Sequence, residues 1–149
     1  MKNLIQNILF FALLSITNAA ALIEIDITEG DREPLPIAIS NFFYDDVDAA
    51  MLSKISNNLS DVVEADLERC GLFAPINEEA FIQKNAAMHL RPRFEDWRLI
   101  KSQALVTGKL KIVDGDKLRV EFRLWDTLAE KELEALVLIT TLDNWRRIS

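Results

Sequence analysis

Two segments of alternating polarity joined by a turn sequence constrain the fold more than any other part of this chain. In 104–112 and again in 118–124, apolar and polar residues alternate with a period of two, which is typical of half-buried β-strands. Asp114 and Gly115 between them form a dipeptide favoured in two-residue hairpin turns. The sequence therefore predicts an antiparallel hairpin, which a third run, 134–142, extends to a meander. The unbroken apolar stretch of that run predicts a strand that is central or buried on both faces.

The other regular elements are predicted before the hairpin. Segment 22–30 alternates and predicts a first strand, and the apolar segment 35–43 predicts a second. Within 52–70, apolar residues recur every three or four positions and Gly71 follows, which predicts a long amphipathic helix with a glycine stop. Shorter elements are predicted in 72–83 (a strand, then a short helix from Asn77) and in 94–103 (a second helix with Trp97 in the core).

This order of elements predicts an α+β domain. We expect a roughly five-stranded mixed sheet with two helices packed on one face. The chain has 149 residues, which is enough for one domain with a substantial core and not comfortably for two.

The first 21 residues have the layout of a secretory signal peptide. Lys2 is followed by an apolar stretch from Ile8 to Ile16 and by small residues at 19–21, which is the three-part pattern of such leaders. The alternative is a membrane anchor, but the apolar stretch is about half of the roughly 20 residues that a spanning helix needs. We expect cleavage between Ala19 and Ala21, a mature domain 22–149, and a periplasmic location if the host is a Gram-negative bacterium.

The charge of the chain argues against two classes of partner. The formal net charge is −7, and removal of the leader would make it more negative because Lys2 would be lost. An acidic exported domain is repelled by nucleic acid and by anionic lipid. We therefore expect neither nucleic-acid binding nor stable membrane insertion after signal cleavage.

Three local features could indicate a chemically active site, but each also has a simpler structural explanation. The single cysteine, Cys70, ends the helical stripe and is predicted to be a small buried residue, with a reactive or intermolecular thiol as the alternative. Asp45, Asp46 and Asp48 precede the long helix and are predicted to cap it, with a metal site as the alternative. His89 is predicted to be a surface or hydrogen-bonded loop histidine, with a catalytic base as the alternative.

Recognisable catalytic and cofactor motifs are missing from the sequence. It contains no glycine-rich phosphate loop, CxxC, HExxH or GxSxG string, and one histidine cannot build a multi-histidine metal site. We therefore expect a non-catalytic protein-interaction domain with no metal and no cofactor. The remaining enzymatic alternative is a hydrolase with paired carboxylates, which would need such a pair in a concave pocket.

Several strings resemble a known family. They are "RPRFEDWR" (91–98), "ALVTGKL" (104–110), "VEFRLWD" (120–126) and "DNWRR" (143–147), preceded by "VVEADLERCGLFAPI" (62–76). In this order they resemble the N-terminal domain of the TolB family of the Tol-Pal system, over essentially the whole mature chain.

The resemblance implies an α/β domain that is followed, in the family, by a six-bladed β-propeller. The family's propeller binds the peptidoglycan-associated lipoprotein Pal, and its mature N-terminus is a mobile strand that contacts the C-terminal domain of TolA. Together these contacts support outer-membrane integrity and constriction at cell division. Because this sequence carries no propeller, we expect a Pal contact only if a propeller is supplied elsewhere.

Carried over to this chain, the TolA-type contact falls on nine residues: Leu22, Ile23, Glu24, Ile25, Asp26, Ile27, Thr28, Glu29 and Gly30. The alternation of this segment agrees in kind, because an extended segment can add a strand to a sheet edge. The alternative is that 22–27 is simply an internal strand.

The last residues raise a further expectation. In the family, "DNWRR" begins another amphipathic helix that packs on the sheet, and here the sequence stops at Ser149. We expect a truncated or split gene product or a cut sequence, with 143–149 frayed and part of the sheet exposed. As a whole, the resemblance implies a non-catalytic periplasmic adaptor of the Tol-Pal system. The alternative is an independent envelope protein-binding module, such as an accessory factor for cell-wall synthesis.

Overall fold

The computed structural model describes residues 33–44, 49–83 and 91–145, which belong to one compact unit, 32–149. The predicted strand 22–30, the aspartates at 45, 46 and 48, and His89 lie outside the described residues. The described elements are β1 (Leu35–Ile39), β2 (Phe43–Tyr44), α2 (Ala49–Arg69), β3 (Phe73–Pro75), the 3₁₀ helix η1 (Glu78–Ala80), α3 (Phe94–Leu99), β4 (Ala104–Val113), β5 (Lys117–Asp126) and β6 (Lys131–Thr141).

The strands form a mixed six-stranded sheet. Its order is β3-β1-β4-β5-β6, and β2 also pairs with β4. Strand β1 is parallel to both β3 and β4, whereas β4, β5 and β6 form an antiparallel meander. The predicted α+β class, the mixed sheet and the meander are confirmed, and the described sheet has six strands without counting the predicted strand 22–30, against roughly five expected in all.

The difference arises because the short β3 joins the sheet and because the predicted strand 35–43 is two strands, β1 and β2. After Ile39 the chain leaves the ladder, and Phe42 turns its ring over Gly108 of β4. A Cβ atom at Gly108 would lie 2.0 Å from Phe42 Cδ1, so only glycine leaves room for that ring. Phe42 also packs edge-to-face on Phe122, with ring centroids 5.1 Å apart. This packing separates β1 from β2.

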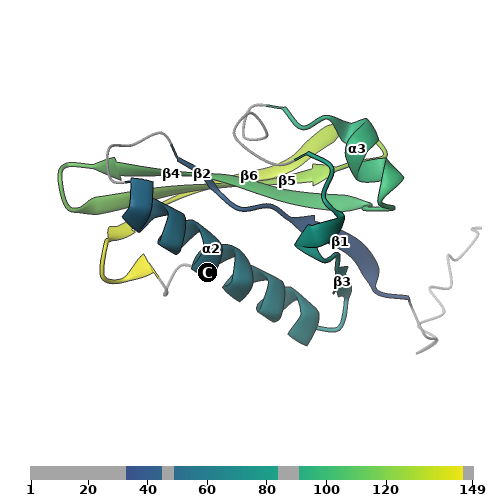
Figure 1. Cartoon of the computed structure of the whole chain (residues 1–149), viewed down its shortest axis with the longest axis horizontal. Helices are drawn as coiled ribbons and strands as arrows, with labels where there is room; N and C mark the ends of the chain where they lie inside the picture. Colours follow the sequence, from purple (N-terminus) through teal and green to yellow (C-terminus); the bar gives the residue numbers. More distant parts are fainter. Residues whose placement is uncertain (1–32, 45–48, 84–90, 146–149) are drawn as a thin grey trace, which may run out of the picture. The chain divides into compact units, whose positions relative to one another are not determined.

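The long helix α2 covers one face of the sheet (Figure 1). Its Leu52, Ile55 and Leu59 form a buried cluster with side chains of β4 and β5. Two buried serines bring it close to the chain that joins β1 and β2: Ser56 Oγ donates to the Phe42 carbonyl at 2.9 Å, and Ser60 Oγ to Asn41 Oδ1 at 2.7 Å. Small hydroxyl side chains permit this approach and satisfy buried polar groups.

The predicted placement of both helices on one face is wrong, because α3 lies on the opposite face from α2 (Figure 1). Ile37 and Ile39 of β1 share a cluster flanked by side chains of α2, whereas Ala38 between them packs with Trp97 of α3. Successive side chains of a strand point to opposite faces. The apolar stripes of the two helices carry no information on which face each one covers, so the sequence could not decide this.

The hairpin between β4 and β5 confirms the predicted turn and changes its length. Val113 pairs with Lys117, so three residues connect the strands instead of two. Asp114 and Gly115 both have positive φ, at 52° and 80°, a conformation favoured by Asp, Asn and Gly.

Two burial predictions are corrected. Strand β6 is an edge strand with exposed apolar side chains, and is neither central nor buried on both faces. Cys70 is exposed: it follows Arg69, the last residue of α2, and its thiol donates to the Leu67 carbonyl at 2.9 Å instead of packing on the sheet. Trp97, by contrast, is 1% exposed, as predicted for a core residue.

Candidate interaction surfaces

The strings that carry the family resemblance build much of the α3 side of the domain. Phe94 and Trp97 of α3 share a buried cluster with Leu105 and Trp125. The Trp125 indole N–H donates to Thr107 Oγ1 at 2.9 Å, and Phe94 packs edge-to-face on the same indole. Since these aromatic residues are buried, their first role is to hold α3 on the sheet.

Gln83 ties this cluster to the chain before α3. Its Oε1 accepts hydrogen bonds from the backbone N–H of Arg93 at 2.9 Å and from the Trp97 indole N–H at 3.3 Å. Gln83 is buried, and a buried carbonyl oxygen with two donors is satisfied. It therefore serves the fold and is not a free polar group aimed at a ligand.

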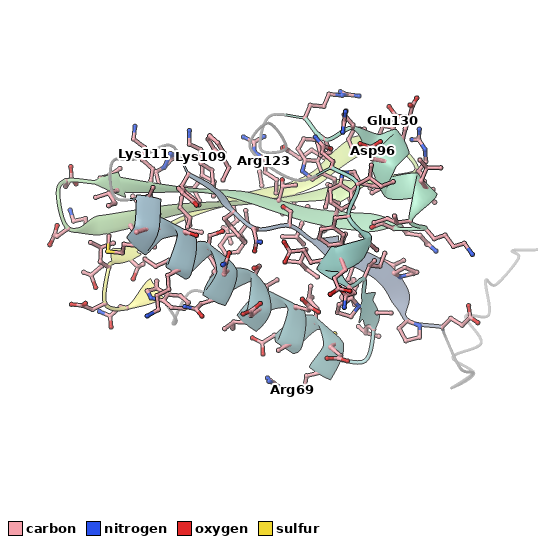
Figure 2. All side chains as sticks on the ribbon, viewed as in Figure 1. Arg69, Asp96, Lys109, Lys111, Arg123 and Glu130 are labelled. Atoms are coloured by element: carbon pink, nitrogen blue, oxygen red, sulfur yellow. The ribbon has the colours of Figure 1, made fainter. Side chains whose placement is uncertain are left out.

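Arginines of α3 and of the segment before it converge on the β5–β6 turn. Arg98 Nη1 lies 2.7 Å from Glu130 Oε1 and donates to the Thr127 carbonyl at 3.2 Å. Arg91 reaches the same carboxylate at 3.7 Å, and its guanidinium lies over the Phe94 ring. Figure 2 shows Asp96 and Glu130 at this end of the sheet. The charges are compensated locally, so this end is not a strong electrostatic site.

The rest of the α3 side of the sheet is rich in cations. Lys109, Lys111 and Arg123 rise from the face opposite α2 (Figure 2). Lys109 Nζ lies 5.4 Å from the centre of the Phe43 ring, and Arg123 pairs with Glu132 at 2.7 Å. Ion pairs on a partly exposed sheet face contribute little to stability, so these charges are not what holds the fold together.

An apolar groove of about 330 Å³ lies on the α2 side of the sheet. Val63 and Leu67 of the second half of α2 form one wall, and Phe122, Leu124 and Leu136 lie on the sheet side. At this position the second half of α2 leaves part of β5 and β6 uncovered. A groove of this size with apolar walls fits side chains of another protein segment better than it fits a charged small molecule.

Acidic residues gather around Glu64 in the second half of α2. Burial raises the pKa of Glu64, and the neighbouring carboxylates of Asp61, Glu68 and Glu78 raise it further. Each of these causes disfavours the charged form of Glu64. The cluster is not a metal site: in the parts of the chain that the structure describes, no three His, Cys, Asp or Glu side chains are grouped to hold an ion.

Strand β6 contributes a second exposed apolar feature. Leu136, Val137 and Ile139 are 50%, 48% and 61% exposed. Leu136 pairs with Phe122 and therefore points to the α2 face, whereas Val137 and Ile139 pair with Glu121 and Arg119 on the α3 face. Sequence reasoning missed both this edge and the groove. The available signal was that no predicted strand follows 134–142 to cover its outer side.

The structure thus places none of the nine predicted contact residues, 22–30, which lie outside the described residues. What it does describe are three surface features: an apolar groove, a cationic sheet face and an edge strand with exposed apolar side chains. Among the described helices, none is long and apolar enough to cross a membrane.

The chain is similar to known proteins over most of its length. Residues 23–133 match the family described as the TolB amino-terminal domain. The Tol-Pal system protein TolB of Pelagibacter ubique is 51% identical over 136 residues, which cover 87% of this chain and 30% of that relative. The chain therefore spans less than a third of the relative's length.

Solved structures agree with this match. TolB from Acinetobacter baumannii is similar with a TM-score of 0.60 and 26% identity, over 78% of this chain and 26% of that one. Lipoprotein GNA1162 from Neisseria meningitidis reaches a TM-score of 0.57 at 17% identity, over 72% of this chain and 81% of that one, which shows a shared fold only. The chain belongs to the TolB amino-terminal domain family of the Tol-Pal system.

Proposed function

We propose that this chain is a non-catalytic periplasmic adaptor of the Tol-Pal system. The observation that carries the proposal is its 51% identity to a Tol-Pal system protein across most of its length. A binding role is also consistent with the described surfaces, which offer apolar and charged contacts and no metal-ligating cluster among the described residues. The leader-like residues 1–21 support export to the periplasm.

The partner we propose is the C-terminal domain of TolA, contacted through 22–30. The alternation of Ile23, Ile25 and Ile27 with acidic residues suits an added strand. In such pairing, backbone hydrogen bonds give affinity and alternate side chains give specificity. Support for outer-membrane integrity and for constriction at cell division would follow from that link. The family resemblance assigns the Pal contact to a β-propeller and not to this domain, so we propose a Pal contact only where a propeller is present.

The proposal is tested by the binding of the purified chain to the isolated C-terminal domain of TolA. Ile25→Pro removes a backbone N–H and fixes φ in the middle of the segment, so we expect binding to fall to background. Ile25→Val keeps both the alternation and the β propensity, so it should bind like the parent chain.

Two outcomes would contradict the proposal. One is the absence of measurable TolA binding by the parent chain. The other is undiminished binding by the Ile25→Pro variant with an unchanged circular dichroism spectrum, which would exclude strand addition through 22–30.

A further inference from the structure

The two edges of the sheet differ in how they are protected. At one edge, β3 is only three residues long and ends at Pro75, whose nitrogen carries no hydrogen to donate. At the other edge, β6 is eleven residues long, and no strand of the described chain pairs with its outer side. Natural edge strands are normally short or blocked by charge, proline or bulges, so β3 is protected and much of β6 is not.

Protection within β6 is confined to its first part. Lys131, Glu132 and Glu134 supply charge there, and the register against β5 shifts between Leu124 and Trp125. From Ala135 to Thr141 the strand has no charge, no proline and no glycine. Such segments of high β propensity are the ones that pair readily with a further strand.

We propose that β6 pairs antiparallel with β6 of a second copy of this chain, about a two-fold axis at Val137. This register sets Leu136 opposite Leu138 on the α2 face and Ala135 opposite Ile139 on the α3 face. Each pair joins side chains of one face, as strand pairing requires. Apolar residues that are about half exposed in the single chain thus meet apolar partners.

The charges of β6 favour this arrangement over the parallel one. In the antiparallel register, Glu134 lies opposite Thr140, and Lys131 and Glu132 extend past Thr141, the last residue of the other copy's β6, so no like charges face each other within the paired strands. A parallel, in-register pair would set Glu132 beside Glu132 and Glu134 beside Glu134. Like charges directly opposite each other destabilise a sheet.

The protected edge explains why pairing would stop at two copies. A contact about a two-fold axis uses the same patch on both chains and closes on itself. After it forms, the outer strand on each side is the short, proline-ended β3. The inference goes beyond the adaptor function proposed above and is independent of it, because it concerns a different strand.

The experiment is sedimentation equilibrium of the full chain over a range of concentrations. We expect a monomer–dimer equilibrium that Val137→Lys weakens at least tenfold, because two lysines would then face each other at the axis. Leu99→Lys is the matched control: Leu99 is also exposed, at 73%, but lies in α3, so its variant should dimerise like the parent. Circular dichroism verifies that both variants are folded.

A cross-linking measurement decides the case if Val137→Lys fails to fold. In a Cys70→Ser background, Val137→Cys should form a disulfide-linked dimer on mild oxidation, since directly opposite residues have Cβ atoms about 4.5–5.5 Å apart. Leu99→Cys in the same background should remain mostly monomeric. A parent chain that stays monomeric at every concentration would overturn the proposal. So would a dimer that Val137→Lys leaves intact, or equal cross-linking at positions 99 and 137.

Discussion

Strands β4 and β6 are both long and apolar, yet they have opposite environments. In β4, Leu105 and Leu110 are fully buried, whereas in β6 Leu136 and Ile139 remain 50% and 61% exposed. Strand β4 has β1, β2 and β5 as neighbours, and β6 has only β5 among the described strands. Burial of an apolar run is therefore decided by its neighbours and not by the run itself.

Helix α2 repeats this contrast along its length. Leu52 and Leu59 in its first half are fully buried against β4 and β5, while Val63 and Leu67 in its second half line the open groove beside β6. The covered half supplies stability, and the open half supplies surface for contacts. Burial of apolar area is the dominant favourable term in folding, so substitutions in the two halves should differ sharply.

The largest expected difference is between the same substitution in the two strands. Leu110→Ala should lower the free energy of unfolding by about 2–5 kcal/mol, because it leaves a cavity in a packed core. Leu136→Ala should lower it by less than about 1 kcal/mol, because half of that side chain is already in water. Urea unfolding of both variants measures the difference, and equal losses would contradict the contrast between β4 and β6.

A second substitution tests the close packing on β4. A methyl group at Gly108 would lie 2.0 Å from Phe42 Cδ1 and 2.6 Å from the Glu121 carbonyl oxygen. Gly108→Ala should therefore destabilise the chain by about 1–3 kcal/mol through overpacking. In a Phe42→Leu background, Gly108→Ala should lower the free energy of unfolding by less than it does in the parent chain, because the Phe42 ring occupies the position that the new methyl group needs. Unfolding curves of the four chains in this cycle give the coupling, and strict additivity would exclude the proposed conflict.

A third substitution tests the buried hydrogen bond from the Trp125 indole of β5 to the Thr107 hydroxyl of β4. Trp125→Phe removes the donor to the buried Thr107 hydroxyl, and an unsatisfied buried polar group costs about 1–3 kcal/mol. Thr107→Val should recover part of this loss in the double variant, because it removes the group left without its donor. Thermal unfolding of the single and double variants is the measurement. No recovery would mean that Trp125 acts through its packing alone.

The smallest effect is expected on the open half of α2. Burial and neighbouring carboxylates raise the pKa of Glu64 in the folded chain, so the folded state binds this proton more tightly than the unfolded state. Charged Glu64 therefore lowers stability above its folded pKa, and the penalty disappears as the pH falls through that value towards the unfolded pKa. Glu64→Gln should stabilise the chain at pH 7 by less than about 0.5 kcal/mol after solvent screening, and not at acidic pH. A gain that persists at low pH would contradict this cause.

Much of the fold could be predicted from local patterns. The alternation and turn of 104–124 define β4 and β5, and the period of α2 with Gly71 at its end defines that helix. These features arise from interactions between residues near in sequence. The break between β1 and β2 was missed because it depends on residues distant in sequence, as Phe42 over Gly108 illustrates. The three-residue turn was missed because an Asp-Gly pair is compatible with hairpin loops of two and of three residues.

The interaction surfaces were less predictable than the fold. The predicted contact segment 22–30 rests on alternation and on the family resemblance, and it stays a prediction. Fraying of 143–149 also stays a prediction, although Trp145 packs against the cluster beneath α2. Exposure of part of the sheet was expected, but the residues of the groove and of the β6 edge could not be identified in advance, since an exposed surface depends on which elements fail to cover it.

The sequence by itself determined the α+β class, the meander, the long helix and membership of the family, because periodicity and local strings encode these directly. Only the tertiary structure decided that α2 and α3 cover opposite faces, that Cys70 is exposed and that β6 is an edge. The physical reason is that apolar periodicity states which side of an element avoids water. It does not state which partner covers that side, and for β6 no described partner does so.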